Sequence, residues 1–282
     1  MLEPTVVTLP AGATAANEDA VAIGPGVVVV VDGAGLPADL RRGCAHSVAW
    51  YAAALASSFR DHLVDGDADM RASLADAIRD VANSHGPGCQ LDLGSPSATV
   101  AAWRVDDDTV DSLVLGDASL IFVSIDSSVT EVCDDRLARV TEPLITRNLQ
   151  GLRRDGLEPT ADDIRQARRA AVEQTRNTPG GFWCCHADPA AASAAVVTRR
   201  PRHELVSVIA ASDGATRGYQ LLDFHGLVDL ARMATDGRAI DALAEVRAAE
   251  SDSTALSSQG MKVHDDATLV TQLLTDAERL RR

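Results

Sequence analysis

Acidic side chains stand at the ends of five predicted strands, and this pattern is the feature of the sequence that could carry chemistry. The first follows the valine run at 27–31, where Asp32 ends an apolar strand and two nearby glycines permit a turn. A carboxylate at the mouth of a buried strand is costly unless a positive charge meets it. The other strand ends carry Asp117, Asp213, the pair Asp265 and Asp266, and the pair Glu18 and Asp19.

These carboxylates would repel one another if the fold brought the strand ends together. Mg²⁺ and Mn²⁺ prefer oxygen ligands, so a divalent cation is the natural counter-charge for such a cluster. Adjacent residues of a strand point to opposite faces. Only one of Glu18 and Asp19, and one of Asp265 and Asp266, can therefore face a shared site, and the alternation alone leaves both choices open.

Six segments carry a resemblance when they are taken in chain order. They are NEDA, VVVDGAG, SATVAAW, LGDASLIFV, ASDGATRG and HDDATLV, and they extend over 17–273. In this order they resemble the metal-dependent serine/threonine protein phosphatases (the PPM, or type 2C, family), in a bacterial form. The resemblance implies an α+β fold, a four-layer α-β-β-α sandwich with two central antiparallel sheets and a metal site at one end.

The resemblance also assigns a role to each matched residue. Asp32 would bridge two ions of Mn²⁺ or Mg²⁺, which would activate a water for in-line attack on a phosphate monoester without any covalent nucleophile. Asp117 matches the acid of a looser third ion. The implied ligands of one ion include Glu18 and the Gly33 carbonyl, those of the other include Asp213 and Asp265, and the implied catalytic set is Asp32, Asp213 and Asp265.

Three positions depart from the family's pattern. Thr14 stands where the family often has an arginine that grips the substrate phosphate, and Ala34 stands where some members have a histidine acid. Arg217 replaces an acid that assists the third ion, and its positive charge disfavours a cation there. We expect Arg217 to contact the phosphate instead, replacing the missing arginine from another direction.

Two other motifs suggest rival sites. The segment GAGLPA at 33–38 fits a dinucleotide-binding pattern, but Asp32 would oppose the pyrophosphate, and the chain about 20 residues on is predicted to be helical. The segment DGDADMRASLAD at 65–76 imitates a calcium loop, but Met70 occupies the position where the turn needs glycine. We therefore expect neither a dinucleotide nor a calcium site.

Cysteine and histidine residues offer two further candidates. Cys184, Cys185 and His186 are soft ligands, but adjacent cysteines fit one tetrahedral zinc ion poorly, so we expect ordinary thiols. His264 precedes Asp265 and could donate a proton near the acids, although a satisfied residue at a strand end is the simpler reading.

Composition limits the partners. The 282 residues are 46% hydrophobic, and 26 Lys and Arg against 41 Asp and Glu give a net charge of −15, which argues against nucleic acid or an anionic membrane. No apolar run approaches the roughly 18 residues of a spanning helix. Five cysteines without a Cys-x-x-Cys pair are typical of a reducing compartment, so we expect a cytoplasmic protein.

Hydrophobic periodicity predicts a single domain over 1–282 with an insertion or flap at 134–200, where apolar residues are sparse. Long blocks of consecutive strands with helices grouped between them favour the α+β class. Predicted strands cover 5–9, 20–23, 26–31, 98–105, 109–116, 119–124, 128–133, 204–211 and 266–273, and predicted helices cover 39–63, 70–84, 160–174, 218–223, 226–234 and 238–250.

The function that the resemblance implies is removal of phosphate from phosphoserine and phosphothreonine. The expected partners are phosphorylated proteins made by a Ser/Thr kinase. The alternative is a catalytically weak or inactive relative that binds phosphoproteins or regulatory partners through the same scaffold, because Thr14, Ala34 and Arg217 all depart from the pattern.

Overall fold

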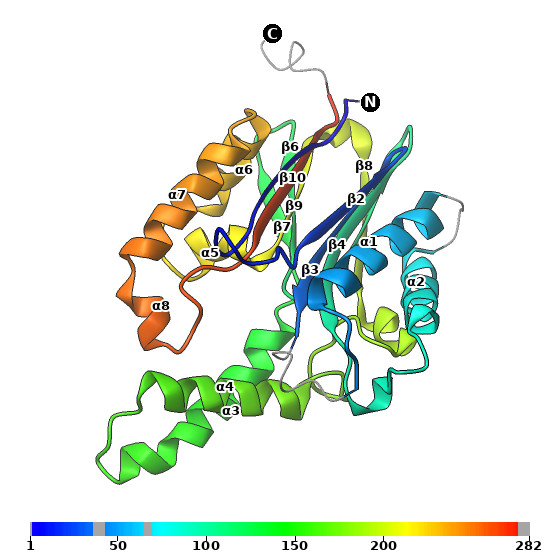
Figure 1. The fold of residues 1–282 in the computed structure, drawn as a ribbon. Coiled ribbons are helices and arrows are strands. Elements are labelled where there is room, and N and C mark those ends of the chain that lie inside the picture. Colours follow the sequence, from blue (N-terminus) through cyan, green and yellow to red (C-terminus); the bar gives the residue numbers. More distant parts are fainter. Residues whose placement is uncertain (1, 36–42, 65–68, 276–282) are drawn as a thin grey trace.

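Two five-stranded antiparallel sheets stand face to face in the computed structural model, which describes residues 2–35, 43–64 and 69–275 (Figure 1). One sheet has the order β1 (Thr5–Leu9), β10 (Ala267–Leu273), β9 (Leu205–Ala211), β6 (Ser119–Ser124) and β7 (Val129–Val132). The other has the order β2 (Ala20–Gly24), β3 (Val27–Ala34), β4 (Ser97–Val105), β5 (Thr109–Leu115) and β8 (Val196–Pro201).

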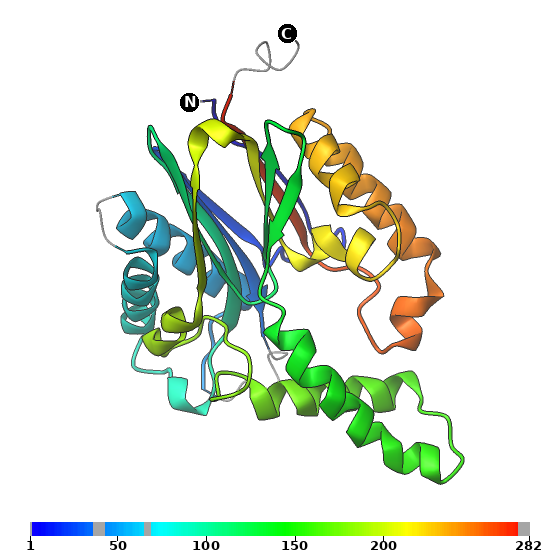
Figure 2. The same ribbon diagram turned by 180° about the vertical axis from the view of Figure 1, so that it is seen from behind.

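Helices cover the outer face of each sheet (Figures 1 and 2). Apolar side chains of α1 (Val48–Val64) and α2 (Met70–Ser84) pack on the sheet that contains β3. Those of α5 (Asp213–Gln220), α6 (Leu227–Thr235) and α7 (Ala239–Asp252) pack on the sheet that contains β9, and the short α8 (Thr254–Ser258) follows them. A third apolar core fills the space between the sheets, so the predicted four-layer α+β sandwich is confirmed.

The valine run of β3 does not alternate with polar residues because both faces of this strand are covered. Val27, Val29 and Val31 pack beneath the helices, whereas Val28 and Val30 lie in the core between the sheets. A strand that is covered on both faces has no polar face to present. The same period of two directs the next residue, Asp32, toward the space between the sheets.

A helical hairpin projects from the end of the sandwich at which β3 ends (Figures 1 and 2). It consists of α3 (Arg136–Arg154) and α4 (Ala161–Thr175). The rest of the predicted insertion returns to the body of the protein: the 3₁₀ turn Pro189–Ala194 buries Ala191 and Ala192 in the core with α2, and 196–201 become β8. The projecting part is therefore narrower than the predicted 134–200.

Two predicted helices begin at other residues than the periodicity suggested. The helix expected from 39 begins at Val48 within the described residues, and 39–42 lie outside them. The helix expected at 218–223 is α5, which begins at Asp213 directly after its N-cap, Ser212. Among the helices that the structure describes, none combines the length and the apolar character needed to cross a bilayer.

Candidate metal centre

The acids at the strand ends gather at one end of the sandwich, between the two sheets. Asp32 lies near the end of β3, and its Oδ2 accepts a hydrogen bond from the backbone N–H of Asp213, at 3.2 Å. Asp213 follows β9 and occupies the first turn of α5, where the helix dipole favours a negative charge. Asp117 lies in the turn between β5 and β6, and Asp265 lies just before β10.

Electrostatic coupling shows that these carboxylates are neighbours. Burial raises the pKa of Asp32 well above its ordinary value, and the charges of Asp213, Asp19, Asp117 and Asp265 raise it further. Burial, followed by the charges of Asp117 and Asp265, raises the pKa of Asp213 to about 7. The pKa of Asp117 is also raised, chiefly by burial. Repulsion between neighbouring carboxylates of this kind is typical of a site that binds a cation.

Asp19, the other member of the first acidic pair, is buried in this cluster. Both of its carboxylate oxygens are shielded from solvent without a hydrogen-bond partner of normal geometry, and burial raises its pKa to about 6, although Thr268 and Ser212 lie near enough to moderate the shift. An unpartnered buried carboxylate is costly. The two oxygens of Asp19 therefore fit a divalent cation.

Glu18 is held differently from Asp19. Its backbone N–H donates to Asp266 Oδ2 at 2.7 Å, and its carbonyl accepts from the N–H of Gly33 at 3.1 Å. Its side-chain charge acts on Lys262: burial lowers the pKa of Lys262, but the charges of Asp265 and Glu18 outweigh this effect and raise it. Glu18 thus lies at the edge of the cluster, and its backbone ties β2 to β3 and β10.

The turn that carries Asp117 depends on a glycine. Gly116 has φ +82°, and a Cβ there would lie 2.5 Å from the Thr99 side chain, so only glycine fits. The Gly116 N–H points to Asp134 Oδ2 at 3.4 Å, and Asp134 forms an ion pair with Arg136 at the start of α3. The charge of Asp134 adds to the pKa shift of Asp117. Asp134 is an acid of this region that the sequence patterns did not identify.

Asp265 pairs with two cationic side chains. Its Oδ2 accepts from Arg217 at 2.6 Å and its Oδ1 from Lys262 at 3.1 Å. Arg217 also bonds to the fully buried Glu250, at 3.3 Å, and its side chain is only 6% exposed. The guanidinium is thus turned away from solvent and engaged by two carboxylates. This arrangement favours a structural role for Arg217, and its contact with the substrate phosphate stays a prediction.

Asp266 and His264, the neighbours of Asp265, serve as structural contacts. Asp266 accepts the backbone N–H groups of Ala11 and Glu18, each at 2.7 Å, and so closes the loop before β2. The Nδ1 of His264 lies 2.9 Å from Glu250 Oε2. His264 is therefore the satisfied residue at a strand end that the simpler reading anticipated.

The donor set fits divalent cations. It contains only carboxylates and backbone oxygens, which hard cations prefer. Among the described residues, however, no three carboxylates bring one oxygen each within 4.8 Å of one another. Mg²⁺ usually keeps several waters and binds through one or two carboxylates, so it does not need such a triplet. A groove of ≈ 730 Å³ lies beside the turn between β2 and β3, at the opposite end of β3 from Asp32.

Comparisons with known proteins agree with this architecture. The chain matches the protein phosphatase 2C family over residues 13–273. Its fold is similar to that of the serine/threonine phosphatase Stp1 from Staphylococcus aureus, with a TM-score of 0.57, 12% identity, and coverage of 98% of this chain and 96% of the other. Among curated proteins, no sequence matches this chain significantly.

Two further solved structures share the fold. The PPM Ser-Thr phosphatase MsPP from Mycobacterium smegmatis, in complex with cacodylate, has a TM-score of 0.53 at 16% identity, over 96% of this chain and 97% of that one. The catalytic domain of the phosphatase PstP, in complex with two manganese ions, has a TM-score of 0.52 at 14% identity, over 95% and 96%. With the family match over most of its length, the chain belongs to the protein phosphatase 2C family, with the phosphatase scaffold of its bacterial members.

Proposed function

We propose that this protein is a metal-dependent phosphatase of phosphoserine and phosphothreonine in proteins. The observation that carries the proposal is the cluster of acids at one end of the sandwich, formed by Asp32, Asp213, Asp117 and Asp19. The raised pKa values of Asp32 and Asp213 and the unpartnered oxygens of Asp19 are those expected of a cation-binding site. Family membership supports the reaction class, and the relative with two bound manganese ions supports the metal.

Each acid has a role in this proposal. Asp32 is central, because the charges of four acids act on it, namely Asp213, Asp19, Asp117 and Asp265. It would lie between two ions of Mn²⁺ or Mg²⁺. Asp213 and Asp265 would hold one ion, and the Gly33 carbonyl with Glu18 or Asp19 would hold the other. When bound, the ions would lower the pKa of a water and offset the charge of the phosphoryl group. Asp117 remains available to a third, looser ion.

The test is hydrolysis of an aryl phosphate and of a phosphothreonine peptide, with and without Mn²⁺. We expect activity that requires the metal and falls at least about 1,000-fold in Asp32→Asn, because this substitution removes the central charge. Asp107→Asn is the matched control, since Asp107 lies exposed in the turn between β4 and β5. Metal-independent activity, or an Asp32→Asn enzyme as active as the control, would refute the proposal.

A second candidate function rests on the Arg217–Asp265 ion pair. Because Arg217 and Lys262 both neutralise Asp265, this acid is less available to an ion than its neighbours are. A protein of this kind could bind phosphoproteins or regulatory partners with little turnover. Manganese binding by calorimetry, without hydrolysis of either substrate, would favour this second function. In both cases we propose phosphoprotein partners made by a Ser/Thr kinase, in the cytoplasm.

A further inference from the structure

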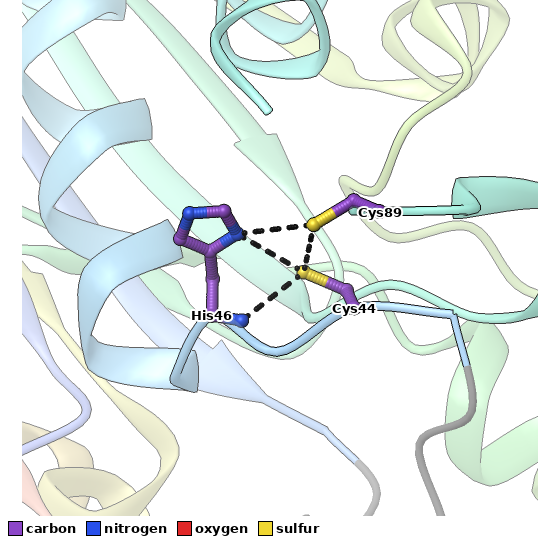
Figure 3. Close-up of side chains that lie close together, drawn as sticks. All are labelled: Cys44, His46 and Cys89. Atoms are coloured by element: carbon purple, nitrogen blue, oxygen red, sulfur yellow. Dashed lines mark hydrogen bonds between the residues drawn. The ribbon is translucent and has the colours of Figure 1, made fainter. Parts of the chain in front are cut away.

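Three side chains with soft ligand atoms meet beside the beginning of α1, and none of them belongs to the carboxylate cluster. Cys44 and His46 lie in the segment before α1, and Cys89 lies in the loop after α2 (Figure 3). The two sulfur atoms are 3.6 Å apart. The Nδ1 of His46 lies 3.3 Å from the sulfur of Cys44 and 3.4 Å from that of Cys89.

These separations suit one tetrahedral metal ion. Zinc bonds of about 2.3 Å to sulfur and about 2.0 Å to nitrogen place two sulfurs about 3.8 Å apart and a sulfur and a nitrogen about 3.5 Å apart. The three observed separations are each shorter than these by about 0.2 Å or less. Two thiolates and one imidazole are a ligand set for zinc, not for the magnesium or manganese that carboxylates prefer.

The backbone holds the two segments together independently of the three side chains. The N–H of Gln90 donates to the carbonyl of Gly43 at 2.6 Å, which places Cys89 beside Cys44. A Cβ at Gly43 would lie 2.2 Å from the Gln90 carbonyl and 2.3 Å from the Gly94 carbonyl, so the close approach needs glycine. The backbone thus fixes the position of both sulfurs before any metal binds.

The surroundings also suit a thiolate–imidazole site. The backbone N–H of His46 points to the sulfur of Cys44 at 3.3 Å, and such a bond favours the charged thiolate. The His46 ring stacks on Trp50 at 3.9 Å and meets the edge of His85 at 4.9 Å, which fixes its orientation.

His85 supports the ring of His46 without joining the ligand group. Its Nδ1–H donates to the Val81 carbonyl at 2.8 Å, and its Nε2 is buried without a partner. The bond to Val81 fixes the orientation of the His85 ring against which His46 packs.

We propose that Cys44, His46 and Cys89 bind one zinc ion, and that water completes its coordination. The ion would link the segment that leads into α1 with the segment that leaves α2. The segment that holds Cys44 follows β3, and the loop that holds Cys89 leads into β4. The two strands meet where Ser97 at the start of β4 donates to the Ala34 carbonyl at the end of β3, at 2.6 Å. The site does not depend on the phosphatase function.

Cobalt provides the decisive probe, because thiolate ligands give Co²⁺ an intense charge-transfer absorption in the near ultraviolet that carboxylates do not give. The reduced full-length protein is freed of metal with a chelator and titrated with Co²⁺ and then with Zn²⁺. We expect one cobalt ion per chain with this absorption, and its loss when one equivalent of zinc displaces the cobalt.

Four variants locate the ion. We expect Cys44→Ser and Cys89→Ser to abolish the absorption and to weaken zinc binding by about 100-fold or more. Cys133→Ser removes an exposed thiol outside the site, so it is the matched control and should retain the cobalt absorption. Asp32→Asn should retain the absorption as well. This result would show that the zinc site is distinct from the carboxylate cluster and can be tested independently of the phosphatase proposal.

Three results would overturn the inference. They are cobalt binding without charge transfer in the reduced wild type, an absorption that survives both serine variants, and a Cys44–Cys89 disulfide that persists in reducing buffer. If the serine variants fail to fold, X-ray absorption at the zinc edge of the wild-type protein decides instead. Two sulfur ligands at about 2.3 Å support the site, and a shell of oxygen and nitrogen alone refutes it.

Discussion

Substitution of Arg217 distinguishes between two roles of this side chain, a structural ion pair and a contact with the substrate. Its guanidinium bridges Asp265 and the fully buried Glu250, so Arg217→Ala leaves Glu250 with Arg247 and His264 and leaves Asp265 with Lys262. Removing one partner of a buried pair costs about 3–5 kcal/mol. We expect a loss of about 3 kcal/mol in the free energy of unfolding without metal, and a smaller loss with Mn²⁺.

Urea unfolding with and without Mn²⁺ measures both losses. The matched control is Arg165→Ala, whose exposed partner Asp162 should make the change nearly neutral. If the protein is active, the KM for a phosphopeptide should remain unchanged in Arg217→Ala, because the guanidinium faces the protein interior. A raised KM of Arg217→Ala, with an unchanged free energy of unfolding, would instead support the phosphate-binding role that the sequence predicts.

Residue patterns predicted the acids at the strand ends, but they could not choose within each acidic pair. Asp19 precedes the first residue of β2, so strand alternation does not govern it. Long-range bonds of the Glu18 backbone to Asp266 and Gly33 position this segment, and no local pattern indicates such bonds. The thiol cluster also left no local signature, because Cys89 is 43 residues from His46 and only the contact of Gly43 with Gln90 brings them together.

At the scale of the elements, a buried polar bond joins the two sheets through their shared core. The buried indole of Trp103 on β4 donates to Gln272 on β10, at 2.8 Å. Trp103→Phe removes volume and leaves the Gln272 oxygen unpaired, so we expect a loss of about 2–4 kcal/mol in the free energy of unfolding.

The double variant Trp103→Phe/Gln272→Leu tests this bond directly. Because it removes both polar partners, it should be about 1 kcal/mol more stable than the sum of the single changes predicts. Urea unfolding followed by circular dichroism measures all three proteins without relying on tryptophan fluorescence. Strict additivity of the two single changes would mean that the bond contributes nothing to holding the sheets together.

Elements with strong periodicity were predicted well, and those stabilised by distant contacts were not. β1, β6 and α2 have the predicted bounds, because the apolar pattern of each lies within its own residues. α3 carries an internal Pro143 and few apolar residues, and β8 exists as a strand because it pairs with β5. Neither α3 nor β8 can therefore be recognised from its own residues without the element that it packs against or pairs with.

For the whole molecule, the carboxylate cluster makes stability depend on pH and on metal together. Folding raises the pKa of Asp19 from 3.8 to about 6 and that of Asp213 from 3.8 to about 7, with burial as the main cause of both shifts. The folded metal-free chain therefore holds more protons than the unfolded chain between these values. Its free energy of unfolding should fall as the pH rises through this window.

Mn²⁺ should reverse that trend, since it competes with protons for the same carboxylates and binds best when they are ionised. We expect the rise in Tm on addition of Mn²⁺ to grow from about pH 5 to about pH 8. Thermal unfolding of chelator-treated protein, with and without Mn²⁺ across this range, measures the effect, and Asp32→Asn should lose most of it while Asp107→Asn retains it. A rise in Tm that is the same at every pH would show that these acids are not the groups that bind the metal.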